Sequence, residues 1–226
     1  MCGIVGLHLK NAELHPRLGE MLVPMLDCMS SRGPDSAGVA LYDGDAMEVV
    51  KDVGRPAEIC ARHGIARRGG FQGIGHTRMA TESAVTTQHS HPFAPRPDMA
   101  VVHNGSFSNH ATVRRRLERH GIACTTDNDT EVAARFIGHQ VAGGADLADA
   151  MCAVLDELDG FFTLLVTTGT QFAVLRDSFA CKPAVIAETR DYVAVASEYH
   201  ALAGLPGVDD ARVFEPVPEE VYTWTR

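Results

Sequence analysis

The sequence lacks the closely spaced cysteine pairs on which structural metal sites and disulfide-rich folds depend. Its six cysteines are spread along 226 residues, and none of them forms a C-x-x-C pair. Zinc and iron–sulfur centres usually use such pairs, and small secreted domains use paired cysteines for stability. We therefore expect free thiols, no metal and no cofactor. The six are Cys2, Cys28, Cys60, Cys124, Cys152 and Cys181.

Long apolar runs and an excess of positive charge are also missing. No apolar stretch approaches the length of about 20 residues that a membrane-spanning helix needs. The N-terminus has no charged segment followed by an apolar core and a cleavage site, as a secretory signal would have. The net charge of −9 disfavours binding to nucleic acid or to anionic membranes. These absences predict a cytoplasmic protein that binds neither nucleic acid nor membrane.

Two histidines, His89 and His91, have a spacing that a metal ion could use. No carboxylate or third ligand lies close to them in the sequence, and a metal site needs at least three protein ligands as a rule. The pattern therefore favours surface or hydrogen-bonding histidines over a metal site.

Hydrophobic periodicity divides the chain into strands and helices of an α+β protein. Two groups of antiparallel strands with helices between them indicate two sheets that pack face to face and are covered by helices. No repeat or linker interrupts the chain, so we expect one domain over residues 1–226. Segments 30–36 and 82–97 are rich in polar residues, glycine or proline and are predicted loops. Strands are predicted at 3–9, 37–42, 46–51, 71–78, 99–103, 161–168, 172–176, 184–188, 193–197 and 221–223, and helices at 15–29, 56–63, 108–120, 130–141, 146–158 and 198–202.

Cys2 is the first candidate for chemistry. We expect an aminopeptidase to remove Met1, because small second residues permit this removal. Cys2 would then carry a thiol with a pKa of about 8.5 beside a free α-amine with a pKa of about 7.7–8.0, and the amine could accept the thiol proton. Glycines follow at Gly3 and Gly6, and they let a ligand approach the backbone closely. The alternative is that Cys2 is an ordinary small apolar residue near a frayed terminus.

Five short motifs together give the chain a specific resemblance. Each is weak alone, but in this order they resemble the class II glutamine amidotransferases, which are N-terminal-nucleophile hydrolases. The resemblance implies a four-layer αββα sandwich of two mainly antiparallel sheets and one type 2 glutamine amidotransferase domain. The pattern is most similar to stand-alone subunits of the glutamate synthase type, such as the amidotransferase-like subunit of N-methylglutamate synthase. The motifs are Met1-Cys2-Gly3-Ile4-Val5-Gly6, Ser31-Arg32-Gly33-Pro34-Asp35-Ser36, Gly75-His76-Thr77-Arg78-Met79-Ala80-Thr81, His103-Asn104-Gly105 and Asp127-Asn128-Asp129-Thr130-Glu131.

The resemblance assigns residues to the two charged ends of glutamine. It implies that Arg78 holds the α-carboxylate, and a guanidinium suits that role because it offers a fixed two-pronged donor. Thr81 could add a hydroxyl to the same carboxylate. Asp129 matches the aspartate that holds the α-ammonium. An intact Arg78 and Asp129 favour an α-amino acid as substrate over other amides.

The resemblance also assigns the reacting groups. Cys2 is the implied nucleophile, and Asn104 and Gly105 match the oxyanion hole, which uses the Asn side-chain NH₂ and the Gly backbone N–H. We expect a side chain at position 105 to crowd the substrate, which would explain the glycine. Arg32 is expected to brace the loops around Cys2 without acting as a catalyst.

The function implied is that of a glutaminase subunit. Cys2 would form a thioester with the glutamine side chain, and the ammonia would pass to a separate, flavin-bearing, glutamate-synthase-like subunit. One alternative is a glutamine-binding module with little or no activity that completes or regulates a partner complex. Another is an N-terminal-nucleophile amidase for a different amide, which Arg78 and Asp129 disfavour.

Overall fold

The computed structural model describes residues 2–44, 46–80 and 84–226. Within them lie twelve strands, five α-helices and four short 3-10 helices. The strands are β1 (Gly3–Leu9), β2 (Ser36–Asp43), β3 (Ala46–Val53), β4 (Gln72–Arg78), β5 (Phe93–Arg96), β6 (Met99–Phe107), β7 (Gly160–Thr167), β8 (Gln171–Arg176), β9 (Val185–Glu188), β10 (Tyr192–Ala196), β11 (Arg212–Phe214) and β12 (Tyr222–Thr225). The helices are α1 (Leu18–Cys28), α2 (Pro56–Arg62), α3 (His110–Arg119), α4 (Asp129–Ala142) and α5 (Leu147–Glu157), with 3-10 turns at Ala12–Arg17, Ile65–Arg67, Tyr199–Ala201 and Val208–Asp210.

The strands form two antiparallel sheets. The first has seven strands in the order β11-β9-β10-β1-β4-β2-β3, and the second has five in the order β12-β8-β7-β6-β5. β1 lies in the middle of the first sheet, where it pairs with β10 on one side and β4 on the other. The N-terminal strand is therefore a rigid element, since its backbone is hydrogen-bonded along both edges.

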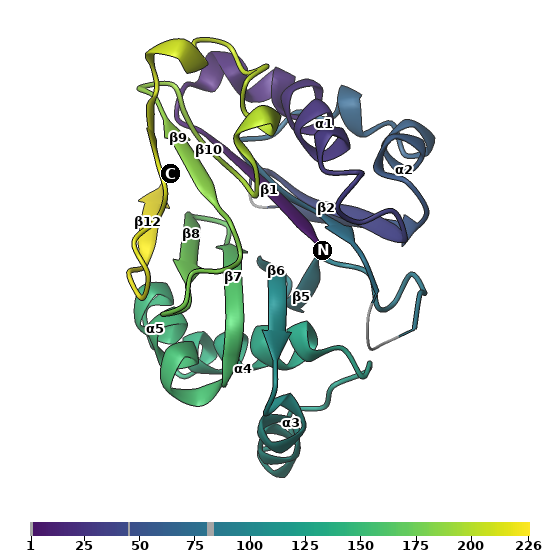
Figure 1. The fold of residues 1–226 in the computed structure, drawn as a ribbon, viewed down its shortest axis with the longest axis vertical. Coiled ribbons are helices and arrows are strands. Elements are labelled where there is room, and N and C mark those ends of the chain that lie inside the picture. Colours follow the sequence, from purple (N-terminus) through teal and green to yellow (C-terminus); the bar gives the residue numbers. More distant parts are fainter. Residues whose placement is uncertain (1, 45, 81–83) are drawn as a thin grey trace.

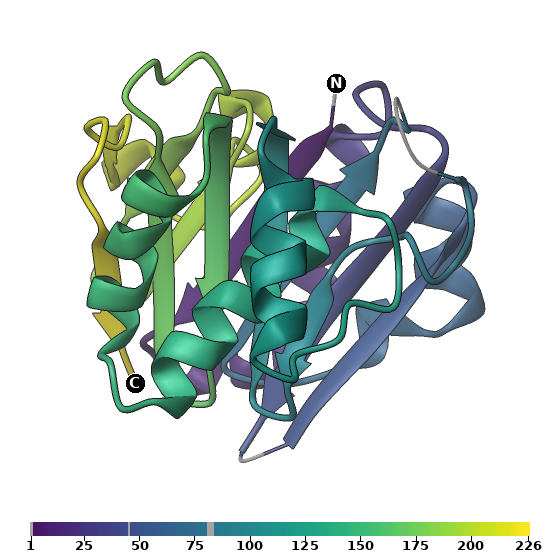
Figure 2. The same ribbon diagram turned by 90° about the horizontal axis from the view of Figure 1, so that it is seen from below.

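The two sheets pack face to face, and helices cover both outer faces (Figures 1 and 2). Between the sheets, apolar side chains such as Ile4, Val102 and Leu165 are fully buried. Burial of each such side chain stabilises the fold by about 1.5–3 kcal/mol. One outer core joins α1 and α2 to the first sheet, and the other joins α3, α4 and α5 to the second. The result is the four-layer αββα sandwich that the sequence predicts.

Helix α1 is shorter than the predicted helix at 15–29. The start of the predicted segment belongs instead to a separate 3-10 helix, Ala12–Arg17, which contains Pro16. Leu18, Leu22 and Met25 then line the buried face of α1, as their spacing indicates. Of the helices in the described ranges, none is long and apolar enough to cross a membrane.

The largest differences from the sequence predictions lie around β5 and β6. Part of the predicted loop at 82–97 forms the edge strand β5, although residues 82 and 83 lie outside the described ranges. The strand predicted to stop at Asn104 continues to Phe107, because β7 pairs with it as far as Gly160. β11 is a further short strand that the sequence did not predict. The extension of β6 places the Asn104–Gly105 segment inside the second sheet.

Candidate active site

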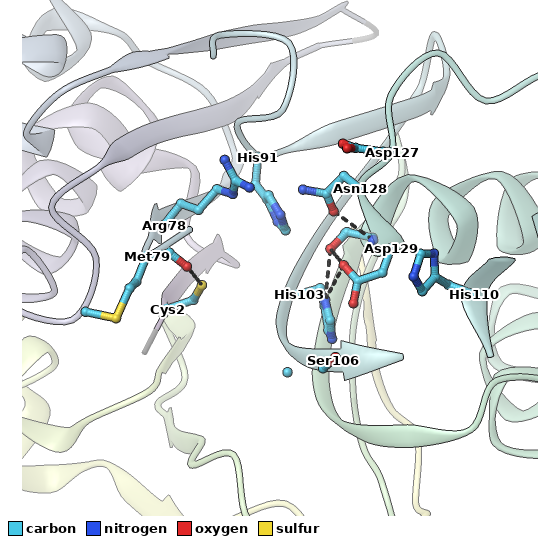
Figure 3. Close-up of a pocket in the computed structure, with 12 residues that line it drawn as sticks. Cys2, Arg78, Met79, His91, His103, Ser106, His110, Asp127, Asn128 and Asp129 are labelled. Atoms are coloured by element: carbon cyan, nitrogen blue, oxygen red, sulfur yellow. Dashed lines mark hydrogen bonds and ion pairs between the residues drawn. The ribbon is translucent and has the colours of Figure 1, made fainter. Parts of the chain in front are cut away.

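An open cavity of about 260 Å³ lies between the two sheets at the start of β1. Strands and loops from both sheets line it. Figure 3 shows Cys2 and Arg78 on one wall and Asp129 and His103 on the opposite wall. The lining residues are Cys2, Arg78, Met79, His91, His103, Gly105, Ser106, His110, Asp127, Asn128, Asp129 and Thr130.

Cys2 directly precedes β1, so a buried central strand fixes the position of its thiol. The Sγ atom lies 3.8 Å from the carbonyl oxygen of Met79. Burial raises the pKa of the Cys2 thiol, whereas the nearby positive charge of Arg78 acts in the opposite direction. Burial thus favours the neutral thiol, and its activation as a nucleophile needs a base.

Arg32 approaches Cys2 from outside the cavity. Its Nε donates to the Cys2 carbonyl oxygen at 2.9 Å, and its Nη1 pairs with Glu198 at 2.5 Å. The loop that carries Arg32 packs tightly on β4, because a Cβ atom on Gly33 would lie 2.5 Å from the backbone of Thr77. The sequence did not single out Glu198 as the partner of this arginine. The contact places Arg32 where it can hold the backbone of the nucleophile.

Arg78 stands at the end of β4 and is 4% exposed. Its Nη1 donates to the backbone oxygen of Ala84 at 2.8 Å. Burial lowers the pKa of Arg78, and the carboxylates of Asp35 and Asp129 partly oppose this change. Because an arginine pKa is far above neutrality, the cavity has one fixed positive charge on this wall.

Asp129 begins α4 on the opposite wall. The side chain of Asn128 caps the helix by accepting from the backbone N–H of Thr130 at 2.8 Å. Asp129 Oδ2 accepts from the backbone N–H of Phe107 at 3.0 Å. A carboxylate in the first turn is also favoured by the helix dipole. These contacts hold a negative charge opposite Arg78.

Asn104 and Gly105 lie side by side on β6. Asn104 is 1% exposed, and its Nδ2 is buried with no hydrogen-bond partner among the described residues. Such an unpaired donor costs stability and calls for a functional explanation. Gly105 has φ +152°, and a Cβ atom there would lie 2.1 Å from the Phe161 carbonyl oxygen and 2.8 Å from His103 Nε2. The structure adds a reason for this glycine that the sequence did not reveal: a side chain would collide with the backbone of β7 and with His103. The expected crowding of the substrate stays a prediction.

The cavity brings together most of the residues that the sequence singled out. Cys2, Arg78, Gly105 and Asp129 line it, Asn104 adjoins it, and Arg32 contacts Cys2 from behind. Thr81 lies outside the described residues.

His91 is not a surface residue, contrary to one of the predicted options. It is 4% exposed, lines the cavity and stacks on His76 with ring centroids 3.8 Å apart. His89 hydrogen-bonds Thr86 and pairs with Asp127 at 2.7 Å. Among the described residues, no group of three or more His, Cys, Asp or Glu side chains could hold a metal ion.

Three buried histidines lie at the site or next to it. Sequence reasoning gave them no role in the chemistry. His76 Nε2 donates to the His103 carbonyl oxygen at 2.9 Å, and His91 stacks on His76. Burial lowers the pKa of His76 to about 3, and it also lowers the pKa of His91 and His103. All three are therefore neutral at physiological pH. His76 and His103 lie within two of the five motifs, and this was the one signal available in the sequence.

These histidines predict a loss of stability in acid. Below pH 6.5 these histidines bind protons in the unfolded chain but stay unprotonated in the folded protein. The free energy of unfolding therefore falls as the pH falls. His76 alone contributes a slope of up to about 1.4 kcal/mol per pH unit, down to its folded pKa. His76→Gln keeps an N–H donor but cannot titrate, so its stability should depend less steeply on pH. Denaturant unfolding at pH 6, 5 and 4 measures the slopes, with His200→Gln as an exposed control. Parallel curves for wild type and His76→Gln would contradict the prediction.

Comparison with known proteins gives a consistent result. Residues 76–204 match a family described as a glutamine amidotransferase domain. The chain is 42% identical to the glutamine amidotransferase-like protein GlxB of Rhizobium meliloti, over 99% of this chain and 98% of that relative. It is 36% identical to a glutamine–fructose-6-phosphate aminotransferase of Shewanella oneidensis, over 74% of this chain but only 26% of that enzyme. A solved structure of the B. subtilis glutamine phosphoribosylpyrophosphate amidotransferase superposes with a TM-score of 0.81 at 26% identity, over 99% of this chain and 49% of that one.

Proposed function

This chain belongs to the class II, N-terminal-nucleophile glutamine amidotransferases, and from that premise we propose that it hydrolyses the side-chain amide of L-glutamine through a thioester on Cys2 and passes the ammonia to a separate synthase subunit. One observation carries the proposal. Arg78 and Asp129 place a positive and a negative charge on opposite walls of the cavity that contains Cys2. An α-amino acid is the substrate that presents a carboxylate and an ammonium together.

Glutamine binds with its α-carboxylate on Arg78 and its α-ammonium on Asp129. Both protein groups are held by backbone contacts, Arg78 by the Ala84 carbonyl and Asp129 by the Phe107 N–H. The substrate therefore enters a site whose charges are already in place, which reduces the entropy lost on binding. The side-chain amide then points toward Cys2 and the Asn104–Gly105 segment.

The reaction begins once Met1 has been removed. The free α-amine of Cys2 accepts the thiol proton, which offsets the burial that raises the thiol pKa. The thiolate attacks the carboxamide carbon, a carbon–sulfur bond forms, and the carbonyl electron pair moves to oxygen. The unpaired Nδ2 of Asn104 and the backbone N–H of Gly105 stabilise this oxyanion.

The tetrahedral intermediate collapses when its carbon–nitrogen bond breaks. The α-ammonium of Cys2 returns its proton to the leaving nitrogen, and ammonia departs. Water then attacks the γ-glutamyl thioester and releases glutamate, which restores the thiol. The Nε of Arg32 donates to the Cys2 carbonyl oxygen at 2.9 Å and so holds the nucleophile in position through these steps.

Substrate recognition is tested by a carboxylate-to-amide change on one wall. Asp129→Asn keeps the shape of the side chain but removes the charge that faces the α-ammonium. We expect the KM for glutamine to rise about 30-fold, which corresponds to the about 2 kcal/mol lost when one partner of a buried charged pair is removed. Asp127→Asn is the matched control, since Asp127 lies at the same cavity but its side chain is 68% exposed. Steady-state ammonia release measures both, and a larger effect at Asp127 would show that the ammonium site is misassigned.

The acceptor of the ammonia is proposed to be another chain in the cytoplasm. The chain covers nearly all of its relative from Rhizobium meliloti but a quarter of the Shewanella aminotransferase. The motif resemblance favours a glutamate-synthase-like, flavin-bearing subunit as the partner. Loop segments 30–35 and 84–92 lie next to the site, since Arg32 contacts Cys2 and Ala84 contacts Arg78. Docking of a synthase on these segments could exclude water and shape a path for ammonia.

Addition of the partner should therefore raise the glutaminase activity. We expect the isolated chain to be slow and the co-purified synthase to increase kcat or lower KM at a stoichiometric ratio. The measurement is ammonia release by the chain alone, by the partner alone and by the mixture. Full activity in the isolated chain, unchanged by the partner, would indicate an independent glutaminase. Glutamine binding without turnover in the mixture would instead indicate a binding module.

A further inference from the structure

A chain of hydrogen bonds ends on Asp129, and the steps above do not use it. His103 Nδ1 lies 2.8 Å from Thr130 Oγ1, and Thr130 Oγ1 donates to Asp129 Oδ1 at 3.3 Å. All three residues line the cavity, and Figure 3 shows the contacts as dashed lines. His103 is 3% exposed and Thr130 is 1% exposed. Bulk water therefore has little access to these two side chains and does not compete for their bonds.

The direction of each hydrogen bond follows from the number of protons available. Thr130 has one hydroxyl proton, which it gives to Asp129, so its oxygen must accept at the contact with His103. The imidazole proton therefore sits on Nδ1. The Asp129 carboxylate, 3.9 Å from the same Nδ1, favours this tautomer electrostatically. Nε2 is left bare, and it is buried without a hydrogen-bond partner among the described residues.

This chain of hydrogen bonds determines how the Asp129 carboxylate is oriented. Asp129 Oδ2 is held by the Phe107 N–H, and Oδ1 is held by the Thr130 hydroxyl. Thr130 lies in the first turn of α4, where the helix offers its hydroxyl no carbonyl four residues earlier. Two donors, one on each oxygen, fix the plane of the carboxylate. Removal of the Thr130 donor would leave the group tied at one oxygen and free to rotate.

We propose that His103 is a positioning residue for glutamine: it acts through the Thr130 hydroxyl to hold the Asp129 carboxylate in the plane that receives the α-ammonium of the substrate. The inference rests on the proposed role of Asp129. His103 also precedes Asn104 on β6 and stacks on Phe107, with ring centroids 4.5 Å apart. One strand thus carries the residue that orients the substrate's ammonium and the residue that binds the oxyanion.

The test uses two substitutions that differ in one hydroxyl. Thr130→Val has a similar shape and removes the donor, and we expect the KM for glutamine to rise about tenfold with kcat within about twofold, as suits a lost hydrogen bond to a charged group. Thr130→Ser keeps the hydroxyl and should stay within about threefold of wild type in both constants. His103→Asn keeps an N–H near the position of Nδ1 and should resemble Thr130→Ser, whereas His103→Leu should resemble Thr130→Val.

A spectroscopic measurement on the wild-type protein tests the chain independently of any variant. Nitrogen-15 NMR of labelled histidines distinguishes the two neutral tautomers, and the His103 signal is assigned by its loss in His103→Asn. We expect the Nδ1–H tautomer. The Nε2–H tautomer would overturn the proposed chain, because Thr130 would then have to donate to His103 and could not donate to Asp129.

Failure of the inference can be told apart from failure of the proposed function. If Asp129→Asn leaves the KM unchanged, Asp129 does not bind the ammonium and the proposed function fails with it. If Asp129→Asn raises the KM and Thr130→Val stays within threefold of wild type, the positioning role of His103 is overturned and the function stands. A tenfold rise in Thr130→Val that Thr130→Ser does not share supports the positioning role.

Discussion

Replacement of Cys2 by alanine should reduce glutamine hydrolysis by at least about 10⁴-fold, the scale of loss when a hydrolase loses its nucleophile. The thiol sulfur is the one protein atom proposed to form a covalent bond with the substrate. Its loss leaves the charged groups on both walls in place, so glutamine binding should persist. The fold should persist as well, because β1 begins at Gly3 and its pairing with β4 and β10 does not involve the Cys2 side chain.

A matched cysteine gives the control for this experiment. Cys152 lies on the exposed side of α5 and does not line the cavity. Cys152→Ala should keep wild-type activity, and thermal unfolding of both variants should match that of the wild type. A Cys2→Ala protein that still hydrolyses glutamine at the wild-type rate would remove Cys2 from the chemistry.

Asn104→Ala is expected to lower kcat by about 10²–10³-fold with a small change in KM, as for other oxyanion-hole donors. The donor matters when negative charge develops on the oxygen, so its loss affects the transition state more than the bound substrate. The structure adds a second expectation. Because Asn104 Nδ2 is buried without a partner among the described residues, its removal should not lower the stability of the free protein.

These two expectations together distinguish a functional from a structural asparagine. Asn11→Ala serves as the control, since Asn11 caps the 3-10 helix at Ala12–Arg17 and its side chain hydrogen-bonds Asp191. That change should cost about 1 kcal/mol of stability and leave kcat unaltered. An Asn104→Ala protein that loses stability but keeps kcat would show that Asn104 supports the fold and not the oxyanion.

Much of the architecture could be predicted from the sequence, because strongly apolar segments reveal their secondary structure locally. The central strand β1 is uninterrupted by charge, and α1 repeats its leucines and methionines at helical spacing. Both patterns arise because the apolar side chains of these elements are buried in the core. The charged ends of the site were found through motifs and not through periodicity, since a buried Arg78 has no local signature.

The features that could not be predicted depend on partners distant in the sequence. The second half of β6 is polar and glycine-bearing, so it resembles a loop until β7, more than fifty residues later, pairs with it. His91 lies in a loop, as predicted, but its burial could not be predicted because nothing nearby in the sequence reveals that it stacks on His76. The steric constraint on Gly105 comes from the Phe161 backbone, which lies far away in the sequence. The contact between Arg32 and Glu198 likewise joins residues far apart in the chain.

The measurement that tests the account most directly is covalent labelling of the mature protein with a glutamine analogue that carries an electrophilic side chain. Intact mass first establishes that Met1 is absent, and peptide mapping then locates the label among the six cysteines. We predict one label per chain, on Cys2, with protection by excess L-glutamine and loss of labelling when an uncleavable N-terminal extension blocks the α-amine. A label on any of the other five cysteines, or equal labelling of Cys2 with the α-amine blocked, would contradict the account.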